Sequence, residues 1–284
     1  MDSKVIVMDI SPATIQAGCL GELVPGVEIP VPKNLFNDQG SLVGMDEFST
    51  LLDTVLLDKL KFSSSKEVKI IYVVPSMTSL AVREKILQLS FDNDSYGLTG
   101  FFLKPSVSAI LFSSARTRNK TSGKEAPNET GLAIRVSKGT SICTVEAANE
   151  GHYLTKASSV LDITSQIGSF NPKLDFNSAA IDLLANTIVE TILRADVGFR
   201  PQLYGNMVLA GGRANELAFY EELKYRIAEK APKGTLVGMT LDGNPESAAW
   251  RGGARYAALF AEKNIFKQQY FESGPGIVHI KCPF

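Results

Sequence analysis

The chain has 284 residues, of which 44% are hydrophobic and 21% charged, a balance typical of a globular protein with a large buried core. The 29 basic residues nearly cancel the 30 acidic ones, so charge gives no reason to expect nucleic acid or an anionic membrane as a partner. This composition excludes a mainly disordered, collagenous or coiled-coil chain.

No stretch of the sequence approaches the roughly 20 apolar residues of a membrane span, and the first residues lack a signal-peptide pattern. We therefore expect a soluble intracellular protein. Three widely spaced cysteines, Cys19, Cys143 and Cys282, suit a reducing compartment. With two histidines and no clustered cysteines, we expect neither a zinc site nor a histidine-based triad.

The first half of the chain is predicted to contain a β-hairpin, two helices and a buried strand. The hairpin spans residues 5–19, the helices span residues 46–60 and 81–91, and the strand spans residues 68–75. Asp46 is the candidate N-cap of the first helix.

A polar run without hydrophobic periodicity, residues 116–129, is predicted as an exposed linker between two halves of the chain. The second half repeats the order of the first. A strand, turn and strand span residues 132–145, helices span residues 178–195 and 216–230, and a buried strand spans residues 206–212. Ser178 is the candidate cap of the first of these helices. The repetition predicts a duplicated α/β unit.

The turn inside each hairpin is a candidate phosphate site, because a tight turn between strands aims successive backbone N–H groups at one point. In the first turn, Asp9 is a candidate for holding a metal-bound water and Ser11 for contacting phosphate. In the second turn, Lys138 and Gly139 are the corresponding candidates. Ordinary β-turns remain the favoured alternative for both.

Two glycine pairs stand out in the second half. Gly211 and Gly212 follow a buried strand, where a nucleotide base or ribose could lie against bare backbone. Gly252 and Gly253 fall inside a predicted helix, where the pair costs about 2 kcal/mol relative to alanine. We therefore expect this second pair to serve close packing rather than ligand contact.

The sequence resembles the actin and actin-related protein family, most clearly over residues 206–284. The strand and turn at 206–212, the Trp-x-Gly-Gly run at 249–253 and the long segment at 269–282 carry the resemblance. It implies an α/β fold of the actin and Hsp70 ATPase type, duplicated into two lobes, with ATP and a divalent metal in the cleft. Residues 22–45 and 165–180 are short where the family carries its outer subdomains, so these are expected to be reduced or missing.

The resemblance divides the chain into four parts. They are a first lobe at 1–115, a flexible loop at 116–130, a second lobe at 131–265 and a C-terminal segment at 266–284 that returns to the first lobe.

The phosphate loops depart from the family pattern. In the first loop, Ser11, Pro12 and Ala13 stand where the family has glycine, serine and glycine, and Gln16 stands at a lysine position. In the second loop, Arg135 and Lys138 stand at two aspartate positions. Elsewhere, Ser106 stands at the position of a water-orienting glutamine, and Glu246 stands at a lysine position near the base. Because phosphoryl transfer depends on positioning and metal electrostatics, we predict no catalytic residues, no metal site and no meaningful ATPase activity.

These departures predict a non-catalytic actin-related protein that serves as a structural subunit of a larger assembly. We expect protein partners, actin or actin-related proteins among them, in a cytoplasmic, cytoskeletal setting such as a dynactin-like complex or a capped filament end. A nuclear subunit of a chromatin-remodelling complex is one alternative. The other is a residual ATP-binding switch whose nucleotide contacts are Asp9, Ser11, Gly139, Gly211 and Gly212.

Overall fold

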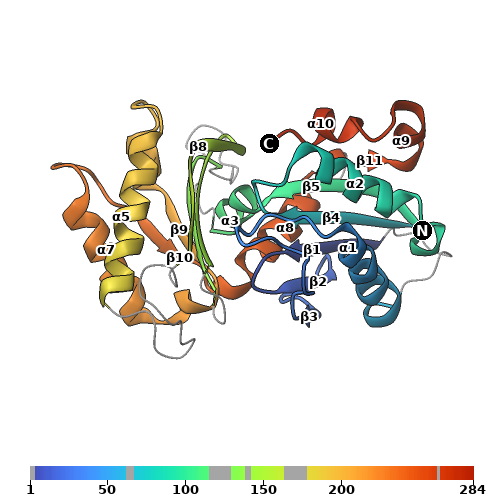
Figure 1. Ribbon diagram of the computed structural model, residues 1–284, viewed down its shortest axis with the longest axis horizontal. Coiled ribbons are helices and arrows are strands. Elements are labelled where there is room, and N and C mark those ends of the chain that lie inside the picture. Colours follow the sequence, from blue (N-terminus) through green and yellow to red (C-terminus); the bar gives the residue numbers. More distant parts are fainter. Residues whose placement is uncertain (1–3, 62–66, 115–128, 138–141, 163–177, 261–262) are drawn as a thin grey trace. The chain divides into compact units, whose positions relative to one another are not determined.

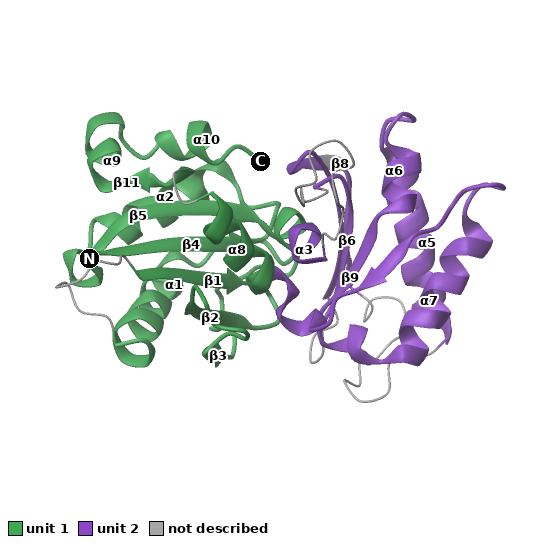
Figure 2. Cartoon of the chain, turned by 180° about the vertical axis from the view of Figure 1, so that it is seen from behind, with its two compact units in different colours: residues 1–109, 250–284 green, residues 110–249 purple. Residues whose placement is uncertain are grey.

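The computed structural model describes residues 4–61, 67–114, 129–137, 142–162, 178–260 and 263–284 (Figure 1). The chain divides into two compact units, residues 1–109 with 250–284 and residues 110–249 (Figure 2). The predicted second lobe extends to residue 265, whereas the structure assigns the chain from Trp250 onward to unit 1. The predicted flexible loop lies almost entirely outside the described residues.

Unit 1 is built on a six-stranded sheet with the strand order β11-β5-β4-β1-β2-β3. Its strands are β1 (Lys4–Ile10), β2 (Ile15–Cys19), β3 (Val27–Ile29), β4 (Val68–Val74), β5 (Leu98–Pro105) and β11 (Ile265–Phe266). Its helices are α1 (Met45–Leu52) with its π-helical continuation (Asp53–Lys59), α2 (Leu80–Phe91), α9 (Lys267–Ser273), α10 (Ile277–Lys281) and most of α8 (Ala248–Leu259). The helix α3 (Ser106–Ser114) contains the division between the units.

Helices cover both faces of this sheet. Neighbouring residues of a strand point to opposite faces, and Tyr72 and Val73 mark the two faces of β4. The ring of Tyr72 packs at 5.8 Å from that of Phe48 on α1, and its hydroxyl bonds to Ser90 on α2 at 3.0 Å. On the other face, a Cβ added to Gly253 of α8 would come within 2.7 Å of the Val73 side chain. The unit is therefore a helix–sheet–helix sandwich.

The glycine pair of α8 serves close packing, as predicted. A Cβ at Gly252 would overlap the carbonyl oxygen of Ala109, and a Cβ at Gly253 would crowd Val7 and Val73. Beside the pair, the Trp250 indole donates a hydrogen bond of 3.0 Å to Val7 O on β1. Trp250, Gly252 and Gly253 therefore allow α8 to pack closely against the sheet, and they do not line a ligand site.

Unit 2 is built on a five-stranded sheet with the order β10-β9-β6-β7-β8. Its strands are β6 (Gly131–Val136), β7 (Ile142–Asn149), β8 (His152–Asp162), β9 (Met207–Ala210) and β10 (Met239–Leu241). Its helices are α5 (Ser178–Arg194), α6 (Arg200–Gly205) and α7 (Leu217–Lys230). The core lies between one sheet face and the apolar stripes of α5 and α7.

The two sheets share one topology. Each begins with an antiparallel meander, β1-β2-β3 or β6-β7-β8, and continues with two strands parallel to the first strand, β4 and β5 or β9 and β10. This repetition confirms the predicted duplication. The fold is the actin-like α/β fold, with the connection between β3 and α1 reduced to residues 30–44.

Two helix starts differ from the predictions. The N-cap of α1 is Gly44, and Asp46 lies in the first turn. There its negative charge interacts favourably with the positive end of the helix dipole. Ser178 is the first residue of α5, and its hydroxyl accepts a hydrogen bond of 2.9 Å from Arg226 on α7. This hydrogen bond links α5 to α7.

Candidate functional site

The turn of the first hairpin is closed by its own serine. Ser11 is 1% exposed, and its hydroxyl donates to Thr14 O at 2.9 Å. The same oxygen accepts from the backbone N–H groups of Ala13 and Thr14 at 3.4 and 3.3 Å, and the Ser11 N–H donates to Thr14 O. Pro12 has no N–H. The donors that a phosphate would require are therefore engaged inside the turn.

Gln16, at the position of the family's lysine, is directed to a different partner. Its side-chain nitrogen donates to a Glu28 carboxylate oxygen at 2.9 Å, between the neighbouring strands β2 and β3. The strand register places Asp9 opposite Gln16 on the other side. A neutral amide bound to a carboxylate supplies no positive charge for a phosphate.

Asp9 lies on the face of the sheet that α8 covers, and it is fully buried. The register aligns Asp9 with Val73 on β4, and Val73 with Lys104 on β5. Lys104 is 7% exposed, and its Nζ lies 4.2 Å from the centre of the Tyr256 ring, a cation–π contact. One row of the sheet therefore holds a buried carboxylate and a buried ammonium, two strand spacings apart.

Ser106, at the position of the family's water-orienting glutamine, is engaged within unit 1. Its hydroxyl lies 3.2 Å from the Ser76 hydroxyl, which also accepts from the Val107 N–H at 3.3 Å. A serine also lacks the reach of glutamine. Together with Ser11 and Gln16, this arrangement does not fit the triphosphate and metal that the family resemblance implies on this side.

In unit 2, Gly211 is required by the backbone itself. Its φ is +94°, and an added Cβ would overlap the carbonyl oxygen of Val136 on β6. The Gly211 N–H donates to Pro245 O at 2.7 Å. Gly212 begins a short 3₁₀ turn and is buried. Strand packing thus accounts for Gly211 without a ligand.

The second turn cannot be placed in full, because Lys138 and Gly139 lie outside the described residues. Arg135, just before it, is 9% exposed on β6. The side chains of Leu132, Ile134 and Val136 enter the core under α5 and α7, so Arg135 points to the opposite face of the sheet.

The structure brings Asp9 and Ser11 together in one hairpin of unit 1, and Gly211 and Gly212 together in one turn of unit 2. Among the described residues, no group of three or more His, Cys, Asp or Glu side chains could hold a metal ion. Within the same residues, no helix has the length and apolar character needed to cross a membrane.

Sequence reasoning missed Lys104 and a groove beside α1. The signal for Lys104 is a single lysine directly after the apolar residues 101–103, because a charge next to an apolar run requires a specific environment once it is buried. The groove lies between residues 29–32 and residues 46–54. No local pattern in the sequence indicates it.

Two sheets that share the same order of five strands, each beginning with an antiparallel meander, define the actin-type class of α/β proteins. Comparison with known proteins agrees: residues 164–283 match the family model described as Actin. Actin-related protein 4 of Mycosarcoma maydis is 35% identical over 103 residues, which cover 35% of this chain and 19% of that protein. The second half of the chain is therefore similar to the actin and actin-related protein family, and the chain aligns with only about a fifth of this relative's length.

Proposed function

We propose that this chain is a non-catalytic actin-related protein that acts as a structural subunit of a larger protein assembly. The observation that carries the proposal is the closed first hairpin, in which Ser11 engages the N–H groups of Ala13 and Thr14. A phosphate loop works by presenting such donors to a ligand. A turn that uses them internally favours a scaffold over a nucleotide switch.

The positions that would assist hydrolysis support the same proposal. Gln16 bonds to Glu28 and Ser106 bonds to Ser76, so each side chain has a structural partner. Hydrolysis requires cations beside the phosphates and a positioned water. Neither neutral side chain adds a positive charge, and each is held by its partner rather than directed to a ligand. Each retained sheet with its packed helices then offers a surface for docking.

The proposed partners are other proteins, actin or actin-related proteins among them, in a cytoplasmic and cytoskeletal assembly. The short connection at residues 30–44 supports docking rather than self-polymerisation, because the family's outer subdomain is reduced there. A nuclear assembly is the alternative, and isolation of the native complex followed by cross-linking mass spectrometry distinguishes the two. Recovery of the chain solely as a free monomer would contradict the assembly role.

Thermal unfolding with and without Mg-ATP tests the scaffold against the nucleotide switch. A ligand at 100 times its Kd stabilises a folded protein by about 2.7 kcal/mol, which is a readily measured shift. We expect no shift with millimolar Mg-ATP and no nucleotide in the purified protein by mass spectrometry. Mg-tripolyphosphate is the matched control for polyanion effects. Stabilisation by ATP alone would establish the switch and overturn the scaffold.

A further inference from the structure

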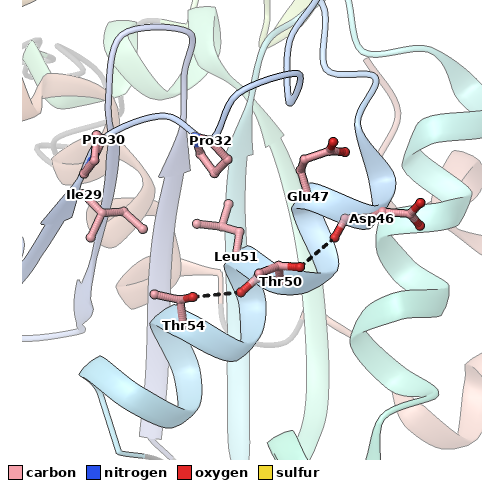
Figure 3. A pocket seen from close by; sticks show the side chains of 8 residues that line it. All are labelled: Ile29, Pro30, Pro32, Asp46, Glu47, Thr50, Leu51 and Thr54. Carbon is pink, nitrogen blue, oxygen red and sulfur yellow. Dashed lines mark hydrogen bonds between the residues drawn. The ribbon is translucent and has the colours of Figure 1, made fainter.

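A groove in unit 1 opens between the end of β3 and the first turns of α1 (Figure 3). It has a volume of about 490 Å³, within the range of roughly 300–1,000 Å³ that is usual for ligand pockets. The lining residues are Ile29, Pro30, Pro32, Asp46, Glu47, Thr50, Leu51 and Thr54.

One side of the groove is apolar. Ile29, Pro30 and Pro32 form the wall that follows β3, and Leu51 points toward them from α1 (Figure 3). Prolines donate no backbone hydrogen bond and prevent extension of an edge strand. A bound segment therefore cannot pair with the backbone beyond Ile29 as an added strand, so side-chain contacts have to provide the recognition.

The hydroxyl groups in the groove are already donating to their own helix. Thr50 donates to Asp46 O at 3.1 Å, and Thr54 donates to Thr50 O at 2.9 Å (Figure 3). The remaining polar side chains are the carboxylates of Asp46 and Glu47, which accept hydrogen bonds and donate none when ionised. In the part of the chain that the structure describes, neither carboxylate forms an ion pair. The groove thus offers apolar surface and negative charge together.

The helix dipole explains why acidic residues suit the first turn of α1, but it does not explain the apolar hollow beside them. A lysine or arginine complements both features. Its aliphatic stem can lie on the proline and leucine surface while its charged head reaches the carboxylates. A purely anionic ligand would be repelled, and a purely apolar one would leave the charges unused.

We propose that this groove binds an extended segment of a partner protein, with one apolar side chain placed between Pro32 and Leu51 and a lysine or arginine beside Asp46 and Glu47. The proposal rests on the assembly role argued above and specifies the chemistry of one docking contact. The apolar anchor supplies affinity, and the charge pairing fixes register and excludes acidic segments.

A positional-scanning library of synthetic decapeptides, each with one fixed central leucine, tests the groove on the full chain. We expect lysine or arginine to be enriched at least about 10-fold within four residues of the leucine, corresponding to about 1.4 kcal/mol. In the D46K/E47K variant this preference should disappear or change to glutamate and aspartate. T50W, which fills the opening without changing charge, should abolish selection altogether.

D38K/D58K is the matched control, because it makes the same charge change at exposed residues that do not line the groove. It should keep the wild-type preference, and thermal unfolding should show that all variants are folded. Absence of basic enrichment, or enrichment unchanged in D46K/E47K, would overturn the docking proposal.

Self-association provides the last arm of the test. Concentration-dependent dimerisation that D46K/E47K abolishes would assign the groove to a second copy of the chain and overturn the partner-peptide proposal. Neither result depends on nucleotide. Failure of the groove therefore remains distinguishable from failure of the scaffold role, which the ATP and native-complex experiments decide.

Discussion

The hairpins that begin the two sheets occupy the same place in the duplicated fold but carry opposite charges. Asp9 pairs with Gln16 next to the end of the first hairpin, and Arg135 pairs with Thr144 at the matching position of the second. Asp9 and Arg135 are both buried. The apolar pattern of the strands preserves the topology, whereas the polar residues next to the turns differ between the two units.

The outer edges of the two sheets also differ. β8 has 11 residues, and Ser159 on this strand bonds to Thr191 on α5 at 2.7 Å. β3 has three residues and is followed by Pro30 and Pro32. In unit 2 a helix is tied to the edge strand by polar contacts, whereas in unit 1 the corresponding region holds the groove. Mutations can therefore test the Ser159–Thr191 contact of unit 2 and the groove of unit 1 separately.

The largest effect is expected from Trp250→Ala in unit 1. Trp250 is 1% exposed, and removal of a buried tryptophan side chain costs about 3–5 kcal/mol. Trp250→Phe keeps most of the apolar contact but removes the hydrogen bond to Val7 O, and should cost about 1–3 kcal/mol. Guanidinium unfolding monitored by tryptophan-independent circular dichroism measures both.

Hydrogen exchange locates this damage. Amides of β1 and β4 should lose protection in Trp250→Ala, while those of β6 and β9 retain most of theirs. Equal loss in both sheets would show that the two units unfold as one cooperative block rather than separately.

Alkaline pH should destabilise both units through one buried thiol in each. Burial raises the pKa of Cys143 and that of Cys282 to about 12, from an ordinary value of 9.0. The unfolded thiol therefore ionises first, so stability is unaffected below about pH 9 and falls by about 1.4 kcal/mol per pH unit per thiol toward pH 12. Unfolding free energies of Cys143→Ala and Cys282→Ala from pH 8 to 11 should each show a shallower fall than wild type. An unchanged slope would mean that the thiol is already ionised in the folded state.

A smaller effect is expected from Thr191→Val at the covered edge of unit 2. Thr191 is fully buried, and its hydroxyl contacts Ser159 and accepts from Arg194 at 3.1 Å. Loss of that hydroxyl should cost about 1–2 kcal/mol and raise exchange in β8. Thr187→Val is the control, because among the described residues the Thr187 hydroxyl bonds only to Leu183 O of its own helix. Its cost should stay within about 0.5 kcal/mol, and a similar loss in both variants would deny a special role to the edge contact.

The regular elements could be predicted from the sequence because their apolar spacing is local. The strand expected at residues 68–75 is β4, and the helix expected at 81–91 is α2 with Ser79 as its cap. On α7, Phe219 is buried in the core, Tyr220 packs against the core from its edge, and the Tyr220 hydroxyl donates to Met239 O at 2.7 Å. This hydrogen bond joins residues of different elements, so the spacing of apolar residues within one helix cannot predict it.

The candidate site was less predictable than the fold. Sequence comparison placed Ser11 and Gln16 at altered family positions, but the partners they found, Thr14 and Glu28, depend on hairpin register and on the neighbouring edge strand. The groove beside α1 brings together segments about 17 residues apart through the short β3–α1 connection. Such features follow from packing, and no single motif contains them.

The smallest effect is expected from Asp182→Asn, which breaks the surface cluster between α5 and α7. Hydrogen bonding to Lys230, at 2.9 Å, and the charge of Arg226 lower the pKa of Asp182. Its stabilisation is therefore present above the carboxylate's ordinary pKa and is lost as the pH falls through the lowered value. Because the pairs are exposed, salt near 1 M should remove the difference between variant and wild type. Asp94→Asn in unit 1, which breaks a single exposed pair with Lys267, is the matched comparison and should change the unfolding midpoint less than Asp182→Asn does. A larger change for Asp94 would mean that the clustering of charges in unit 2 adds nothing beyond a single pair.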